Sequence, residues 1–142
     1  AAGNHPMMDS HFFNCCFVCG PGRKPADGLR IFAGIVEDQD YVAADWIPDL
    51  CFADDSGLVR NEIVWAALDC PGAWAALTDR LRPIVLGRIA VEIINPVKAG
   101  QKLVVIGWKI AEEGRKIQVG TALFDEDSRL LAKARAIWIE LK

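Results

Sequence analysis

The stretch 61–78, NEIVWAALDCPGAWAALT, is the feature that most constrains the fold of this chain. Between Ile63 and Leu77 it contains one charged residue, Asp69, and nearly all of its other residues are small or apolar. A helix that is apolar on every side is normally buried on every side. The pattern therefore predicts a central helix around which the rest of the chain is arranged.

One strip of this helix combines small side chains with an acid, because steps of three, four and seven residues return to the same face. The strip comprises Glu62, Ala66, Asp69, Ala73 and Ala76, with the bulky Trp65 beside it. Burial disfavours the charged form of a carboxylate and raises its pKa, which would prepare Asp69 to act as a general base or nucleophile. The residues expected to contact a substrate are Glu62, Trp65, Ala66 and Ala73.

Pro71 supports a second interpretation of the same acid. Proline has no N–H to donate and biases the residue before it away from helical angles, so the helix could break at Asp69-Cys70-Pro71. Asp69 would then cap a second helical segment, with Pro71 in its first turn. The two roles are compatible, and both remain open at this point.

Length and charge limit the class of protein. A chain of 142 residues is long enough for one domain with a single core. Its net charge of −3, without a basic run, gives no electrostatic footprint for nucleic acid or an anionic membrane. Residues 1–11 are interpreted as an expression remnant and N-terminal tail, and 12–142 as one domain. With no long apolar run and no secretory pattern, we expect a soluble cytoplasmic protein.

Five cysteines, an odd number, argue against a disulfide framework and favour a reducing compartment. Cys16 and Cys19 have the C-x-x-C spacing of half a zinc site. A structural zinc needs four ligands, and the other candidates, His11, Cys51 and Cys70, occur singly. Structural thiols are therefore favoured over zinc, and no metal or cofactor is expected.

Six segments have the alternation or β-type composition of strands. They are 29–36, 41–47, 84–94, 103–111, 117–124 and 129–141. The first two form a predicted hairpin. The last four follow one another through short turns, which predicts a meander of antiparallel neighbours. The predicted order is two strands, one buried helix and four strands.

A single sheet can cover a helix on all sides only by curling around it, which is the geometry of the hotdog fold. The chain resembles the hotdog thioesterase superfamily over roughly residues 16–141, through the order and spacing of four motifs. These are CFVCG at 16–20 followed by GLRI at 28–31, VWAALD at 64–69, NPVKAG at 95–100 and AKARA at 132–136. The resemblance implies an α+β hotdog domain, a curved antiparallel β-sheet wrapped around one central buried helix.

In the phenylacetate-pathway type of hotdog thioesterase, the acid of the helix is the base or nucleophile, and it matches Asp69. A backbone N–H eight residues earlier polarises the thioester carbonyl across the dimer interface, and that position is Asn61 here. The family usually has a His-Gly-Gly run at this point, which this chain lacks. A backbone donor does not depend on the side chain, so Asn61 is retained as the donor, with N-cap as its alternative role.

The resemblance also implies an acyl-CoA or similar thioester substrate and a homodimer or homotetramer. The CoA phosphates could be bound by arginines, of which the candidates are Arg60, Arg80, Arg82 and Arg88. Hydratases and dehydratases of this fold use a histidine, and the two histidines, His5 and His11, precede the first predicted strand. The competing hypothesis is a non-catalytic hotdog protein that binds a thioester or another apolar ligand.

Overall fold

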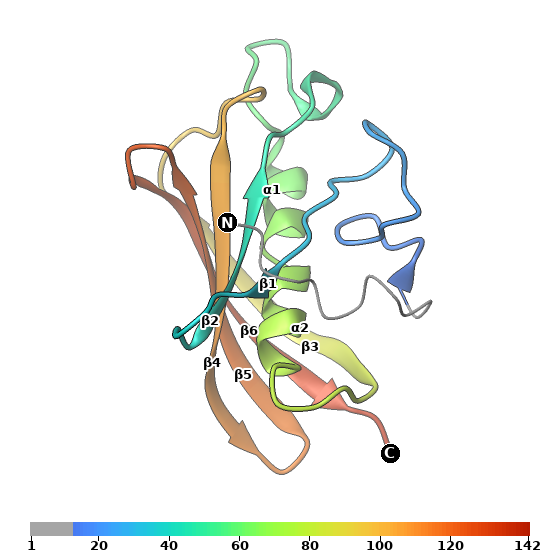
Figure 1. The fold of residues 1–142 in the computed structure, drawn as a ribbon. Helices are drawn as coiled ribbons and strands as arrows, with labels where there is room; N and C mark the ends of the chain where they lie inside the picture. The colour runs from blue at the N-terminus through green and yellow to red at the C-terminus, as the bar shows by residue number, and fades with distance from the viewer. Residues whose placement is uncertain (1–12) are drawn as a thin grey trace.

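The computed structural model describes residues 13–142, so the interpretation of residues 1–11 and any role of His5 or His11 lie outside the described part. Six antiparallel strands form one sheet, and two short helices lie end to end across one of its faces (Figure 1). The strands are β1 (Gly34–Ile35), β2 (Tyr41–Trp46), β3 (Ile84–Ile93), β4 (Leu103–Glu113), β5 (Lys116–Asp125) and β6 (Leu130–Glu140). The helices are α1 (Asn61–Ala67) and α2 (Cys70–Ala76), preceded by the 3-10 turn η2 (Leu50–Phe52).

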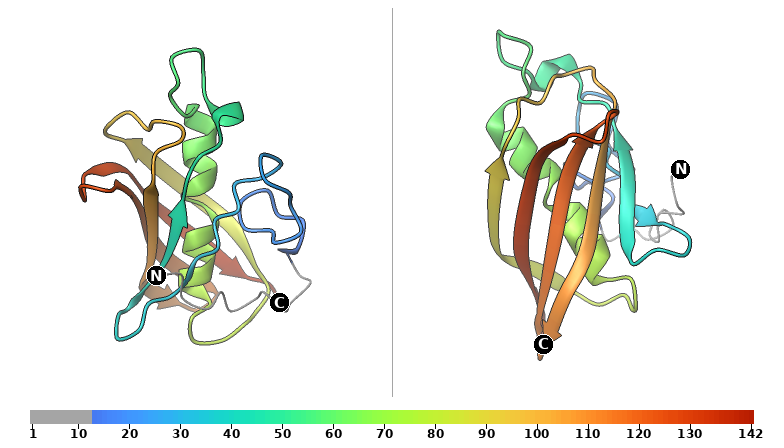
Figure 2. Two further views of the ribbon diagram at one scale, coloured as in Figure 1. Left: turned by 45° about the horizontal axis from the view of Figure 1, so that its top comes forward. Right: turned by 90° about the vertical axis from the view of Figure 1, so that its left-hand side faces the viewer.

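The sheet is twisted and bends around the helices (Figure 2), which is the hotdog architecture. Segment 13–33 lies on the helix side of the sheet, beside α1 and α2 (Figure 1). The predicted order of two strands, helix and four strands is confirmed. Among residues 13–142, no helix is long and apolar enough to cross a membrane.

The first strand is much shorter than predicted. Of the predicted strand 29–36, only Gly34 and Ile35 pair with β2. The N–H groups of Leu29 and Ile31 donate instead to the carbonyls of Phe17 and Val18, at 2.8 Å each. The backbone N–H groups of the predicted strand thus bond to the turn at 16–19 instead of to a neighbouring strand. These bonds hold the turn against the rest of the domain.

The predicted meander of four strands is only partly correct. The sheet order is β1-β2-β4-β5-β6-β3, so β4, β5 and β6 are successive neighbours but β3 pairs with β6 rather than β4. The segment between β3 and β4 carries the chain back to β2, and it is held there by a bond from the Gly100 N–H to the carbonyl of Pro48, just after β2, at 2.8 Å. β3 and the two-residue β1 are the two edges of the sheet.

The predicted helix consists of two seven-residue helices with the break at Leu68 and Asp69, so the interpretation in which Pro71 interrupts the helix is confirmed. Pro71 lacks an N–H, and the Gly72 N–H donates to the Asp69 carbonyl, so the helix ladder leaves the Leu68 carbonyl free. Thr121 of β5 satisfies it, because its buried hydroxyl donates to that carbonyl at 2.9 Å. The junction between the helices is therefore held by the sheet.

The core lies between the helices and the inner face of the sheet. α2 is buried along most of its length, whereas α1 buries only Ile63, Val64 and Ala67. The prediction that the helix is buried all round is thus wrong for α1, where the Trp65 side chain is 41% exposed. At Gly107 of β4 an added Cβ would lie 2.5 Å from the Pro71 carbonyl oxygen, so the start of α2 rests directly on the strand backbone.

The buried Arg82, which lies between α2 and β3, bonds to two carboxylates. Its guanidinium donates to both carboxylate oxygens of Glu112, at 2.6 and 2.9 Å, and to Glu140 at 3.0 Å. These charge-assisted bonds lower the pKa of Glu112 to about 2. They connect the segment after α2 to β4 and β6.

Candidate active site

Asp69 lies between α1 and α2, at the point where the helix is broken. The residue is half-buried. Its Oδ1 is shielded from solvent and has no hydrogen-bond partner among residues 13–142. A buried carboxylate oxygen without a partner is costly, and such groups are concentrated at functional sites. The break therefore presents a carboxylate that the described structure does not use for its own stability.

Burial is the main reason why the pKa of Asp69 is raised to about 6, and negative charge at Cys16 raises it further. The capping interpretation is confirmed only in position: Asp69 occupies the N-cap site of α2, but its side chain makes no capping hydrogen bond. At pH 7 most Asp69 side chains would be ionised and able to accept a proton.

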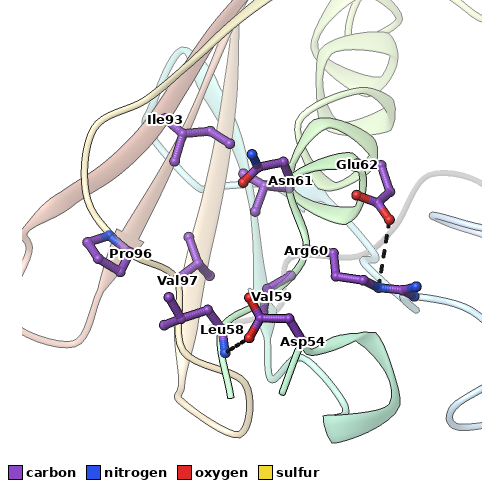
Figure 3. Close-up of a pocket in the computed structure, with 10 residues that line it drawn as sticks. Asp54, Leu58, Val59, Arg60, Asn61, Glu62, Ile93, Pro96 and Val97 are labelled. Carbon is purple, nitrogen blue, oxygen red and sulfur yellow. Dashed lines mark hydrogen bonds and ion pairs between the residues drawn. The ribbon is translucent and has the colours of Figure 1, made fainter. Parts of the chain in front are cut away.

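Asn61 is the first residue of α1, and Arg60 is its N-cap, so the interpretation of Asn61 as N-cap is wrong. N–H groups at the start of a helix have no intrahelical partner. Asn61 and Glu62 border a pocket of about 290 Å³ (Figure 3). The other lining residues are Asp54, Leu58, Val59, Arg60, Val64, Ile93, Pro96 and Val97.

Asn61 and Asp69 do not meet in the described chain. They stand at the two ends of α1, eight positions apart, which corresponds to about 12 Å at 1.5 Å per residue. Asp69 is also not among the residues that line the pocket at Asn61. The structure of the single chain thus places the proposed donor and the proposed base at two separate positions.

The predicted substrate-binding residues are distributed over both helices. Glu62 is exposed, and its carboxylate lies 3.7 Å from the Arg60 guanidinium. Ala66 of α1 and Ala73 of α2 are half-buried, on either side of the break at Asp69, and only Glu62 borders the pocket at Asn61. Contact of these residues with a substrate remains a prediction.

The candidate arginines have different environments. Arg82 is buried in its bonds to Glu112 and Glu140, and Arg80 contacts Glu140 at 3.1 Å. These two are occupied by internal ion pairs. Arg60 borders the pocket at Asn61, where its guanidinium lies 3.7 Å from the Glu62 carboxylate.

Three cysteines form a cluster, although the sequence favoured structural thiols over a zinc site and offered Cys70 only as one of three single candidate ligands. The sulfur atoms of Cys16, Cys19 and Cys70 all lie within 4.8 Å of one another. Hydrogen bonds from Cys19 and then Cys70 lower the pKa of Cys16, whereas the pKa values of Cys19 and Cys70 are raised. The C-x-x-C spacing was the available signal, but only the fold brings Cys70 to it, next to Asp69.

No family model matches the chain. A protein of Saccharolobus solfataricus, provisionally named an esterase, is 29% identical over 84 residues, which are 58% of this chain and 55% of that protein. The chain thus spans about half the length of this relative.

Solved structures resemble the whole sheet and helix arrangement. The PaaI protein from the phenylacetic acid degradation operon of E. coli has a TM-score of 0.71 at 12% identity, covering 80% of this chain and 81% of its own. A thioesterase of Haemophilus influenzae has a TM-score of 0.70 at 16% identity, covering 80% of each chain. A Streptococcus mutans protein bound to acetyl-CoA has a TM-score of 0.68 at 11% identity, covering 75% of this chain and 86% of its own. The chain has the hotdog fold, which it shares with these structures, the Haemophilus influenzae thioesterase among them.

Proposed function

We propose that this protein hydrolyses an acyl thioester, acyl-CoA being the first candidate, with Asp69 as general base or nucleophile. The observation that supports this most directly is the half-buried Asp69 carboxylate, whose Oδ1 has no partner within residues 13–142. The fold and the esterase name of the relative support hydrolysis as the general chemistry. The acetyl-CoA bound to one structural neighbour supports a CoA thioester.

In the proposed reaction, Asp69 removes a proton from a water that attacks the carbonyl carbon, or it attacks that carbon itself to form an anhydride that water then hydrolyses. Collapse of the tetrahedral intermediate breaks the C–S bond, and the thiolate leaves as a thiol after taking up the proton that came from the water. The N–H of Asn61, at the start of α1, stabilises the developing oxyanion. Because these two groups are about 12 Å apart along one chain, the donor comes from a second subunit. The site is therefore proposed to lie at the interface of a homodimer or homotetramer.

The free edge at β3 is compatible with such an assembly. Edge strands have unpaired backbone groups that proteins usually cover or pair. The exposed side of α1, with Glu62 and Trp65, would be covered in the same assembly. Trp65 and Ala66 would then border the substrate from the subunit that supplies Asp69.

The base is tested by thioester hydrolysis against a panel of short, long and aromatic acyl-CoA substrates. Asp69→Asn keeps the shape of the side chain and should lower kcat by roughly 10²–10⁴-fold, as expected for loss of a general base. Asp127→Asn, an exposed acid in the turn between β5 and β6, is the matched control and should leave activity unchanged. Equal activity of Asp69→Asn and wild type would refute the mechanism.

The donor is tested by two substitutions at one position. Asn61→Pro deletes the backbone N–H, and proline suits the first residue of a helix, particularly after the extended Arg60. Asn61→Ala keeps the N–H. The proposal predicts that only Asn61→Pro loses activity, by roughly 10²–10³-fold.

Mixing the two inactive variants tests whether the site is shared between subunits. In a dimer of one Asp69→Asn and one Asn61→Pro chain, a shared site leaves one of two sites intact. Random mixing should then restore about one quarter of wild-type activity, because half of the dimers are mixed. No recovery, with mixed dimers verified by mass spectrometry, would place both groups in one subunit or refute the donor.

The second candidate function is binding of a thioester or another apolar ligand without turnover, favoured by the missing glycine run at 59–61. It would be supported if wild-type protein were inactive across the panel but retained a ligand in native mass spectrometry. An inactive protein without a ligand would contradict both functions.

A further inference from the structure

The three clustered cysteines are located where two segments of the chain meet. Cys16 and Cys19 lie in the turn at 16–19, within segment 13–33, and Cys70 is the first residue of α2. Fifty-four residues separate Cys16 from Cys70, yet their sulfur atoms are 3.6 Å apart. That separation is far longer than a disulfide bond of about 2.05 Å, and all three cysteines are free.

The arrangement has the dimensions of a thiolate metal site. In a tetrahedral zinc site with Zn–S bonds of about 2.3 Å, two sulfurs lie about 3.8 Å apart. The Cys16–Cys70 distance of 3.6 Å is close to this value, and none of the three sulfur pairs exceeds 4.8 Å. Shifts of a few tenths of an ångström up to one ångström would bring all three sulfurs to a common ion.

The turn that presents Cys16 and Cys19 is closely defined by its backbone. The Cys19 N–H lies 3.5 Å from the Cys16 sulfur, in position to donate to it, and the Gly20 N–H donates to the Cys16 carbonyl at 2.9 Å. A Cβ at Gly20 would lie 2.5 Å from the carbonyl oxygens of both Asn14 and Cys16, so only glycine fits there. Backbone donors to a sulfur stabilise its thiolate form, which is the form that binds metals.

We infer that Cys16, Cys19 and Cys70 bind a thiophilic metal ion, Zn²⁺ in the first place. Sulfur ligands in tetrahedral geometry select zinc over hard cations such as Mg²⁺ and Ca²⁺. This replaces the expectation from sequence that the chain binds no metal, because the sequence could not single out Cys70 from the candidates His11 and Cys51 as the third ligand. It does not rest on the proposed thioesterase activity.

Binding needs no oxidant or reductant. Each thiol that is still protonated loses its proton to the solvent as its sulfur binds the ion, so uptake at constant pH releases protons. Cys19 is buried, while Cys16 and Cys70 are half-buried. A water or another small ligand would complete the four positions, and the ion would link the N-terminal turn to α2.

The test is a Co²⁺ titration of the purified protein under a non-thiol reductant, followed by Zn²⁺ competition. We expect one equivalent of Co²⁺, a sulfur-to-metal charge-transfer band, tetrahedral ligand-field bands, and displacement by Zn²⁺ with a higher Tm. Absence of these bands in the wild type would overturn the inference, and this result requires no variant to fold.

Variants assign the ligands. Cys70→Ser and Cys16→Ser should weaken Co²⁺ binding by roughly 100-fold or more. Cys15→Ser, which alters the exposed neighbour of Cys16, and Cys51→Ser, which alters another exposed cysteine, should bind as the wild type does. Circular dichroism verifies that each variant is folded. Equal binding by folded Cys70→Ser and wild type, or loss of binding in Cys15→Ser, would refute this ligand set.

Discussion

The hydrogen bond between Thr121 and Leu68 gives a direct test of how the helix break is maintained. The substitution Thr121→Val replaces the hydroxyl by a methyl group of similar size and therefore leaves no cavity. It removes the partner of the Leu68 carbonyl, in a place where both residues are almost completely buried. An unsatisfied buried acceptor costs about 1–3 kcal/mol, so we expect the free energy of unfolding to fall by about 2 kcal/mol.

For a chain of this length, each kcal/mol corresponds to about 2–4 °C, so Tm should fall by about 4–8 °C. The assay is urea unfolding followed by circular dichroism, at one fixed protein concentration because assembly affects apparent stability. The midpoint should fall while the slope m stays constant.

Thr121→Ser is the matched control, because it keeps the hydroxyl and removes only the methyl group. We expect it to cost about 0.5–1.5 kcal/mol, as for removal of one buried methyl group. A Thr121→Val protein as stable as the wild type, or more stable than Thr121→Ser, would show that the bond does not hold the break.

Two further substitutions test the packing and the charges described above. Gly107→Ala places a Cβ against the Pro71 backbone and should lower the free energy of unfolding in urea by about 1–3 kcal/mol. Gly114→Asn, in an open turn with φ of +58°, should leave that free energy nearly unchanged. Equal stability of the two variants would contradict the close approach of α2 to β4. Because the folded pKa of Glu112, about 2, lies below its ordinary value of 4.5, its contribution is full above pH 4.5 and is lost as the pH falls toward 2. Glu112→Gln should therefore flatten the loss of stability between those pH values in acid unfolding curves, and an unchanged slope would refute the ion pair.

The sequence predicted best those features that depend on neighbouring residues, above all the positions of the strands. Alternation located five of the six strands to within two or three residues, because each buries one face against the helices. The same alternation could not identify the neighbour of β3, since strand order depends on contacts between distant segments. Nor did it reveal which face of β4 is the inner one, where Leu103 and Val105 are buried.

For the candidate site as well, the sequence indicated the local features and missed the contacts between distant segments. Asp69 could be singled out because a lone acid in an apolar helix is unusual, and Pro71 indicated the break. The short β1 could not be predicted, because the backbone donors of Leu29 and Ile31 are taken by the turn at 16–19. Cys70 could be named only as one of several candidate ligands, since its proximity to Cys16 exists only once α2 and the N-terminal segment have packed together.

The division of the helix into two seven-residue parts has a consequence for cooperativity. Isolated helices of this length do not persist in water, because nucleation costs more than so few hydrogen bonds return. Neither α1 nor α2 can therefore stay folded once the sheet has unfolded. The Leu68 carbonyl between them accepts from the Thr121 hydroxyl, which is in position only while β5 is paired in the sheet. Helix and sheet must be lost together, so the free energy of unfolding belongs to the domain as a whole and cannot be assigned separately to its two layers.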